Sequence, residues 1–122
     1  MINGVQDIYY SITDAKRSIE FYTQALGMTL IAQQEFWISL DCGGVRIGLH
    51  PEENPIPFVP RDSHGAHAGG TLTLKSDNIA QDRMRLQEHG AKILGEVDQP
   101  WGHMLVFEDP DGNVLKLMKP KY

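Results

Sequence analysis

The sequence lacks the features that mark several classes of protein. Cys42 is the only cysteine, so no disulfide can form within the chain and no cysteine pair indicates a zinc or redox site. No apolar run approaches the ~20 residues that a membrane-spanning helix needs. Residues 1–7 lack the basic start and apolar centre of a signal peptide. We therefore expect a cytoplasmic protein that does not bind a membrane.

Positive charge is also scarce. The 122 residues include 11 lysine and arginine residues against 16 aspartate and glutamate residues, which gives a net charge of −5. Nucleic acid is not expected as a partner, because phosphate binding needs a concentrated basic face. The charge instead favours neutral or cationic small molecules. A chain of this length forms one domain with a core of its own.

What the sequence does contain is one pattern of elements that occurs twice. Each copy is predicted as a strand, a helix and three more strands. In the first copy Asp14 or Thr13 begins the helix and Gly27 ends it, and in the second copy Asp77 and Gly90 do so. Asp77 follows Asp14 by 63 positions, and Gly90 follows Gly27 by the same number. The expected strands are residues 5–12, 28–34, 36–40 and 45–49, then 70–75, 91–97, 103–108 and 114–119.

This repetition predicts an α+β fold of two βαβββ modules, with mixed sheets that are cupped around a cleft. We expect a single domain over residues 1–122, with modules at 1–50 and 66–122. The proline-rich connector at 51–65 holds four prolines, which exclude a helix or a central strand there. Its length makes it a candidate lid or arm. On the second helix, Ile79, Met84 and Leu86 are the expected buried side.

A tight hairpin is predicted within residues 107–118. Pro110 and Gly112 favour the turn, while Asp109 and Asn113 offer side chains to local backbone groups. Beyond the turn, alternation places Lys116 on one strand face between two apolar neighbours.

These residues carry a family resemblance. The strings ITD at 12–14, RSIEFY at 17–22, LGM at 26–28 and EDPDGN at 108–113 resemble the vicinal oxygen chelate superfamily. It includes glyoxalase I, extradiol dioxygenases, fosfomycin-resistance proteins and bleomycin-resistance proteins. The resemblance implies the paired-module fold and a homodimer. It also implies a divalent metal held by His, Glu or Gln side chains from the first and last strands of each module.

The superfamily's four metal positions fall on Asp7, Gly48, Thr71 and Lys116. Only Asp7 offers a good ligand, because glycine has no side chain, a hydroxyl binds metals poorly and a protonated lysine repels a cation. We therefore expect no metal and no other cofactor. An alternative stays open, in which Asp7 and one or more of His50, His67 and His103 form a displaced metal site.

In place of the metal we expect Asp7 and Lys116 to form an ion pair. The pair would be a polar anchor at the bottom of an apolar cup, or it would only close the pocket floor. In a third interpretation Lys116 extends into solvent. The pocket walls would come from aromatic side chains and one histidine, which are Tyr9, Phe36, Trp37, Phe58, Trp101 and His103.

Three functions follow from these expectations. The first is a metal-independent binding protein similar to the bleomycin-resistance branch, which captures a small hydrophobic or cationic compound and so sequesters an antibiotic. Its ligand-binding residues are predicted to be Asp7, Tyr9, Trp37, Trp101, His103 and Lys116. The second is a divalent-metal-dependent lyase, isomerase or dioxygenase that uses the displaced site. In the third the domain acts by association alone, and its own side chains fill the cleft.

Overall fold

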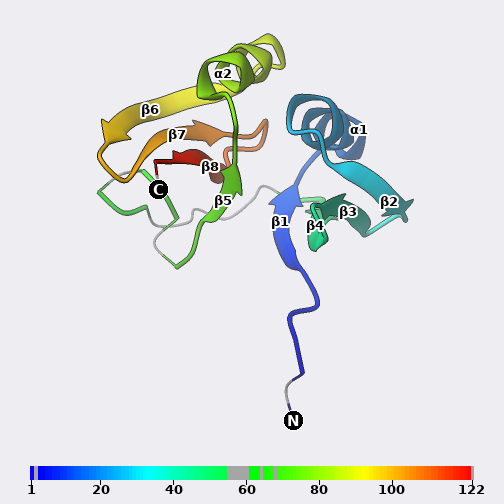
Figure 1. Ribbon diagram of the computed structural model, residues 1–122. Coiled ribbons are helices and arrows are strands. Elements are labelled where there is room, and N and C mark those ends of the chain that lie inside the picture. The colour runs from blue at the N-terminus through cyan, green and yellow to red at the C-terminus, as the bar shows by residue number, and fades with distance from the viewer. Residues whose placement is uncertain (2, 55–60, 64, 68, 122) are drawn as a thin grey trace. The chain divides into compact units, whose positions relative to one another are not determined.

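The computed structural model describes residues 1, 3–54, 61–63, 65–67 and 69–121. The chain divides into two compact units, Met1–Ile56 and Pro57–Tyr122, and each unit is treated by itself below. The first contains β1 (Ile8–Ile12), α1 (Ala15–Glu20), the π-helical turn η1 (Phe21–Ala25), β2 (Thr29–Gln33), β3 (Ile38–Cys42) and β4 (Val45–Pro51) (Figure 1). The second contains β5 (Leu72–Lys75), α2 (Ile79–Glu88), β6 (Lys92–Gln99), β7 (Gly102–Glu108) and β8 (Val114–Pro120).

Both units contain a four-stranded mixed sheet with the same topology. The strand order is β1-β4-β3-β2 in the first unit and β5-β8-β7-β6 in the second. The first and last strands of each unit pair in parallel, and the remaining pairs are antiparallel. The predicted α+β fold of two βαβββ modules is confirmed.

The helical segment of the first unit begins and ends as its sequence predicts. The Asp14 side chain accepts a hydrogen bond from the Arg17 N–H at 3.0 Å, and Gly27 follows the helix with φ of 73°. The π-helical turn between them adds one residue to the helical repeat. The neighbouring side chains of Phe21 and Tyr22 are both buried, with 2% and 0% exposed, and together with Ser18 and Ala25 they show the i, i+3, i+4, i+7 spacing of one helix face.

The second helix departs from the prediction by one residue. Asn78, not Asp77, is the N-cap, and its side chain accepts a hydrogen bond from the Gln81 N–H at 3.1 Å. Ile79 and Leu86 are buried as expected, seven positions apart on one helix face. Met84 is 63% exposed, because five positions from Ile79 carry it round to the other side.

The limits of the strands also differ from those expected, by up to three residues. Residues 5–7 precede β1, and Val5 is 84% exposed. Phe36 lies outside β3 and is 57% exposed. Pro51 ends β4 opposite Ile12 of β1, and it is tolerated there because β3 pairs with β4 only as far as Leu49. Of the predicted connector, positions 55–60 and 64 lie outside the described residues.

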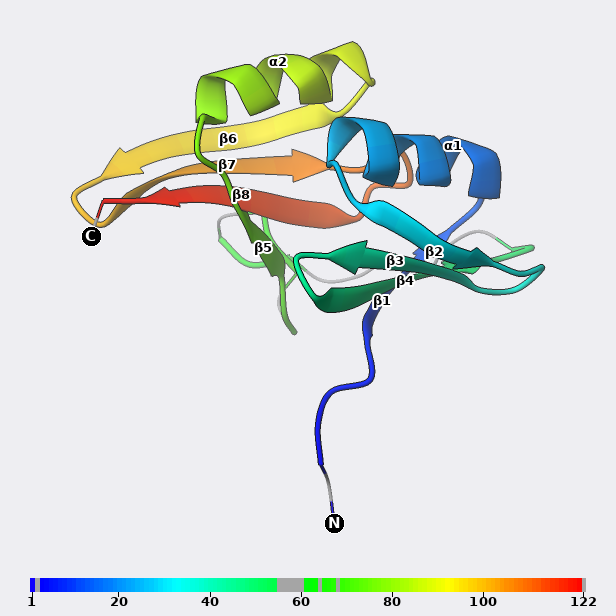
Figure 2. The same ribbon diagram turned by 45° about the vertical axis from the view of Figure 1, so that its right-hand side comes forward.

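The two faces of the first sheet have different compositions. Figure 2 shows α1 lying over one face, and that face is fully buried at Ile38, Leu40, Ile47 and Leu49. The register pairs Tyr9 and Ser39 with Gly48, so alternation places these residues and His50 on the opposite face. We call that opposite side the open face of the first sheet.

The second sheet has the same division. Figure 1 shows α2 lying over one side of it. The register pairs Leu105 with Leu117 and Phe107 with Leu115, and these four buried residues form its core side. Val106 and Thr73 flank Lys116 in the register, and Met104 pairs with Met118, so these residues share the other side. No helix in the described part of the chain is long and apolar enough to cross a membrane.

Candidate functional site

Three rings gather on the open face of the first sheet. The ring centroids of Tyr9 and Trp37 are 5.3 Å apart at an interplanar angle of 61°. The His50 ring lies 6.4 Å from each of them. Tyr9 is 56% exposed and the His50 side chain 38% exposed, so the cluster is accessible to solvent. We call these three residues the aromatic cluster.

Trp37 takes its place in this cluster because residue 48 is a glycine. A Cβ atom added at Gly48 would lie 2.2 Å from Cζ2 and 2.6 Å from Cη2 of Trp37, closer than real Cβ contacts come. The indole therefore rests directly on the backbone of β4. Trp37 Nε1 also donates a hydrogen bond to Ser39 Oγ at 3.1 Å. These two contacts fix the position of the ring.

A carboxylate orients the third ring. His50 Nδ1 lies 2.9 Å from Glu52 Oε1, and Ser11 Oγ donates to the same oxygen at 3.3 Å. The Glu52 N–H donates to the Ile12 carbonyl at 2.8 Å, which fixes the backbone that carries the carboxylate. An ionised carboxylate only accepts hydrogen bonds, so Nδ1 of His50 must be the donor.

The structure brings together two of the predicted ligand-binding residues, Tyr9 and Trp37, and adds three that the sequence prediction missed, Ser11, Ser39 and Glu52. The available signal was alternation, since positions 48, 50 and 52 follow one another at a spacing of two. Asp7 precedes β1 and is partly buried, and its carboxylate has no hydrogen bond or ion pair with a described residue. Phe58 lies outside the described residues.

The predicted residues of the second unit are spread over both sides of its sheet. Lys116 lies on the side away from α2. His103 lies on the side of α2, where its Nε2 is 2.9 Å from Glu96 Oε2, and Arg83 of α2 pairs with the other oxygen of Glu96. Hydrogen bonds from Arg83 and then from His103 hold the pKa of Glu96 below its usual value.

These contacts separate His103 from Lys116, because residues on opposite faces of a sheet do not share a pocket. The register places the two residues on opposite faces, and a ligand-binding role for either one stays a prediction. Trp101 lies in the turn between β6 and β7 and is 47% exposed. Asp7 belongs to the first unit and Lys116 to the second, so their pairing stays a prediction.

The predicted hairpin between β7 and β8 is held by a buried aspartate. Asp109, which is 4% exposed, accepts hydrogen bonds at Oδ1 from the N–H groups of Asp111 and Asn113, both at 2.9 Å. Its Oδ2 accepts from Asn113 Nδ2 at 2.9 Å. Gly112 adopts φ of 84°, as the turn requires.

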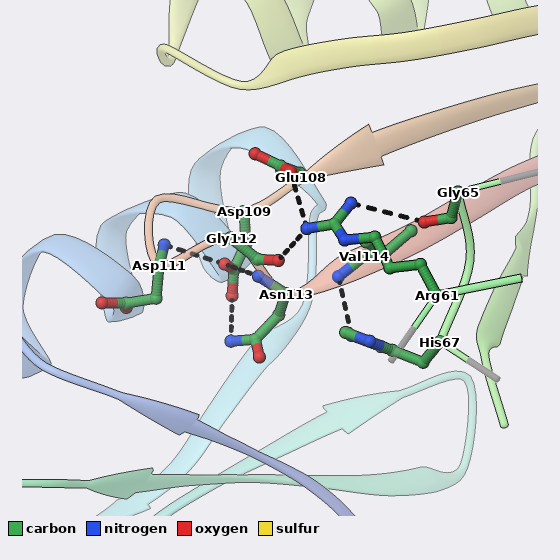
Figure 3. Close-up of polar contacts among 9 residues, drawn as sticks. All are labelled: Arg61, Gly65, His67, Glu108, Asp109, Asp111, Gly112, Asn113 and Val114. Atoms are coloured by element: carbon green, nitrogen blue, oxygen red, sulfur yellow. Dashed lines mark hydrogen bonds and ion pairs between the residues drawn. The ribbon is translucent and has the colours of Figure 1, made fainter. Parts of the chain in front are cut away.

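Hydrogen bonds of Arg61 and His67, which precede β5, connect this part of the chain to the hairpin (Figure 3). Arg61 donates hydrogen bonds to Glu108 Oε1 at 2.8 Å and to the Gly112 carbonyl at 3.2 Å. His67 Nε2 accepts the Val114 N–H at 3.0 Å. Burial and then the Arg61 charge lower the pKa of His67, which keeps it neutral and able to accept.

The residues at the superfamily's metal positions do not fit a divalent ion. The Trp37 indole occupies the space of any side chain at position 48. The Thr71 hydroxyl donates to the His67 carbonyl at 3.3 Å, and Lys116 brings a positive charge. Within either unit, no group of three or more described His, Cys, Asp or Glu side chains is placed to hold a metal.

A family model described as the Glyoxalase/Bleomycin resistance protein/Dioxygenase superfamily matches residues 4–117. The chain belongs to this superfamily. The resemblance found in its sequence is thereby confirmed. Members of this superfamily bind small molecules.

Three known proteins show how this superfamily member relates to others. Metallothiol transferase FosB of Staphylococcus haemolyticus is 32% identical over 120 residues, with 96% of this chain and 84% of the relative covered. The structure of the fosfomycin resistance protein FosX from Listeria monocytogenes matches with a TM-score of 0.76 at 17% identity, over 99% of this chain and 96% of the other. The structure of TnmS3, an antibiotic binding protein from Streptomyces sp. CB03234, matches with a TM-score of 0.64 at 26% identity, over 99% of this chain and 100% of the other.

Proposed function

We propose that this protein binds a small hydrophobic or cationic compound without a divalent metal, and that it sequesters an antibiotic in this way. The Trp37 indole on Gly48 carries the proposal, because an aromatic surface occupies a position that holds a metal ligand in enzymes of the superfamily. Aromatic rings bind flat molecules by stacking and cations by their negative faces. The net charge of −5 favours a cation.

The binding surface is the aromatic cluster of Tyr9, Trp37 and His50. Its rings are partly exposed, and the Trp37 ring is fixed before any ligand arrives, which reduces the entropy lost on binding. The similarity to TnmS3, named as an antibiotic binding protein, supports an antibiotic as the ligand class. Asp7, Trp101, His103 and Lys116 remain predicted ligand-binding residues, to be tested one by one.

The test is a titration of chelator-treated, desalted protein with proflavine, a flat cationic dye, followed by the anisotropy of the dye's own fluorescence. We expect saturable binding without metal. Trp37→Leu should weaken it about tenfold or more, because alanine-type truncation of a central aromatic contact commonly removes at least 1.4 kcal/mol. Trp101→Leu measures separately what the second tryptophan contributes. Equal binding by the wild type and Trp37→Leu would contradict the proposal.

A metal-dependent lyase, isomerase or dioxygenase is the second candidate, and a metal-dependent transferase belongs with it because FosB is named a metallothiol transferase. Elemental analysis of protein purified without chelator, with thermal melts in Mn, Fe, Ni, Co and Zn salts, decides between the candidates. Stoichiometric metal or clear stabilisation by one ion would favour the enzyme. We expect neither, because three of the four ligand positions carry unsuitable residues.

We also propose that the protein is a homodimer, as the family resemblance implies. Light scattering should then give about twice the chain mass of 13.7 kDa. A monomer at working concentration would contradict this part of the proposal and leave ligand binding untouched.

A further inference from the structure

The pairing of His50 with Glu52 is not needed for stacking. Glu52 Oε1 lies 2.9 Å from Nδ1 of the imidazole. A carboxylate in this position accepts a hydrogen bond from the Nδ1–H group, so the ring keeps its proton on Nδ1. The neutral ring then has an unprotonated Nε2, which is the atom that accepts a proton in histidine-based catalysis. The arrangement therefore selects one tautomer of His50.

The surroundings hold this tautomer in place and leave Nε2 accessible. Ser11 Oγ donates to the same carboxylate oxygen, and the Glu52 backbone is tied to Ile12. No described residue forms a hydrogen bond with Nε2 of His50. The side chain is 38% exposed, so a bound compound can reach it.

The imidazole also lies beside the surface on which a flat compound would stack. Its centroid is 6.4 Å from the centroids of both Tyr9 and Trp37. A two-ring aromatic molecule placed over Trp37 extends across such a distance, so that its edge meets the imidazole. A general base needs its acceptor nitrogen at the edge of a positioned substrate, and the ring separation allows His50 to reach that edge.

We propose that His50 is a general base, positioned by Glu52, that abstracts a proton from a flat aromatic substrate held on the aromatic cluster. The inference rests on the proposed function for the place where the substrate binds. Nε2 takes the proton, the C–H electron pair forms a new π bond, and a leaving group departs with its own pair. The step needs no metal, oxidant or reductant.

The test uses 5-nitrobenzisoxazole, a flat two-ring compound, with chelator-treated protein. Abstraction of its C3 proton converts the C–H pair into part of a nitrile, breaks the N–O bond and leaves a coloured phenolate. We expect the protein to accelerate this elimination beyond free imidazole at equal concentration. His50→Gln should lower kcat about 100-fold with KM changed less than twofold, as loss of a general base does.

His89→Gln is the matched control, because this histidine ends α2 in the other unit and has no role in the proposed site. It should leave kcat and KM unchanged. Glu52→Gln should lower kcat about tenfold at constant KM, because the amide also donates hydrogen bonds and no longer fixes the tautomer. The double variant His50→Gln, Glu52→Gln should be no slower than His50→Gln alone, since Glu52 acts through His50.

Proflavine binding separates the two proposals. If the wild type binds the dye but turns over no faster than free imidazole, or if His50→Gln keeps its full rate, the general base is refuted and ligand binding stands. If the wild type binds neither dye nor substrate, both proposals fail. Retained dye binding by His50→Gln with the expected loss of kcat supports the inference, because the variant is then folded and the stacking surface of Tyr9 and Trp37 is intact.

Discussion

The two sheets share one topology, and each carries an imidazole 2.9 Å from a carboxylate oxygen. The two histidine–carboxylate pairs nevertheless differ in their surroundings. His50 and Glu52 lie on an open face beside two aromatic rings. His103 and Glu96 lie under α2, where Arg83 binds the same carboxylate. In the first pair no described residue forms a hydrogen bond with Nε2 of His50, the atom that we propose acts on a bound compound, while the second pair joins a helix to its sheet. The face of the sheet, more than the residue types, decides the role.

The largest expected difference between the units concerns their hairpins. Asp109→Ala should lower the free energy of unfolding by about 3 kcal/mol, because it removes several hydrogen bonds and leaves the buried Asn113 amide without that acceptor. Asp41 lies near the end of β3, beside the corresponding turn in the first unit, and among the described residues its side chain accepts a hydrogen bond only from Gly44 N–H, at 3.4 Å. Asp41→Ala should change stability by less than about 0.5 kcal/mol in urea denaturation.

The second comparison concerns glycines within the two sheets. Gly48→Ala should destabilise the protein by about 1–3 kcal/mol, because its Cβ atom collides with the Trp37 indole. It should also weaken proflavine binding by displacing the ring. Gly95→Ala is the matched change in β6, where a Cβ atom meets nothing within 4 Å. Equal stability of the two variants in thermal melts would show that Trp37 is free to move.

The third prediction concerns His67 of the second unit, whose Nε2 accepts the Val114 N–H. Because its pKa is lowered in the folded protein, the unfolded chain takes up a proton that the folded chain does not. Its stabilising contribution is therefore complete above the ordinary histidine pKa of ~6.5 and falls as the pH drops below that value. Unfolding measurements at pH 7.5 and 5.5 should show this loss in the wild type and a smaller one in His67→Gln.

The smallest expected effect is that of the Arg83 ion pair. Arg83→Gln should change stability by about 0.5 kcal/mol or less, since partly exposed ion pairs contribute little. It should still raise the pKa of Glu96 towards its usual value, because Arg83 is the main cause of the shift. Carboxyl titration by NMR measures this, and an unchanged Glu96 pKa would contradict the assignment.

Local signals were sufficient to predict most of the fold. Alternating strands, the Asp14 cap, Gly27 and the hairpin at Asp109 each depend on neighbouring residues, and each is present in the structure. The second cap was missed by one residue because Asp77 and Asn78 are both good N-cap residues, and sequence alone does not choose between them.

The site was less predictable because it depends on how strands pair. Trp37 precedes β3, and its contact with Gly48 follows from the register that sets Ser39 opposite Gly48. The two-residue turn at Gly43 and Gly44 specifies this register, because it sets Cys42 opposite Val45, but the sequence prediction did not follow it along the strands to Gly48. His103 and Lys116 were assigned to one pocket before their strand faces were known, and the register that pairs Lys116 with Val106 places them on opposite sides.

The contact between Trp37 and Gly48 also limits how this protein can change by mutation. A glutamate introduced at position 48 alone meets the indole, and a smaller residue at position 37 alone leaves a bare glycine with no ligand atom. Either single substitution disturbs the aromatic surface of Trp37 without yet providing a working metal ligand at position 48. The two positions are therefore epistatic, and a lineage that moves between an aromatic surface and a metal ligand at this point must change both.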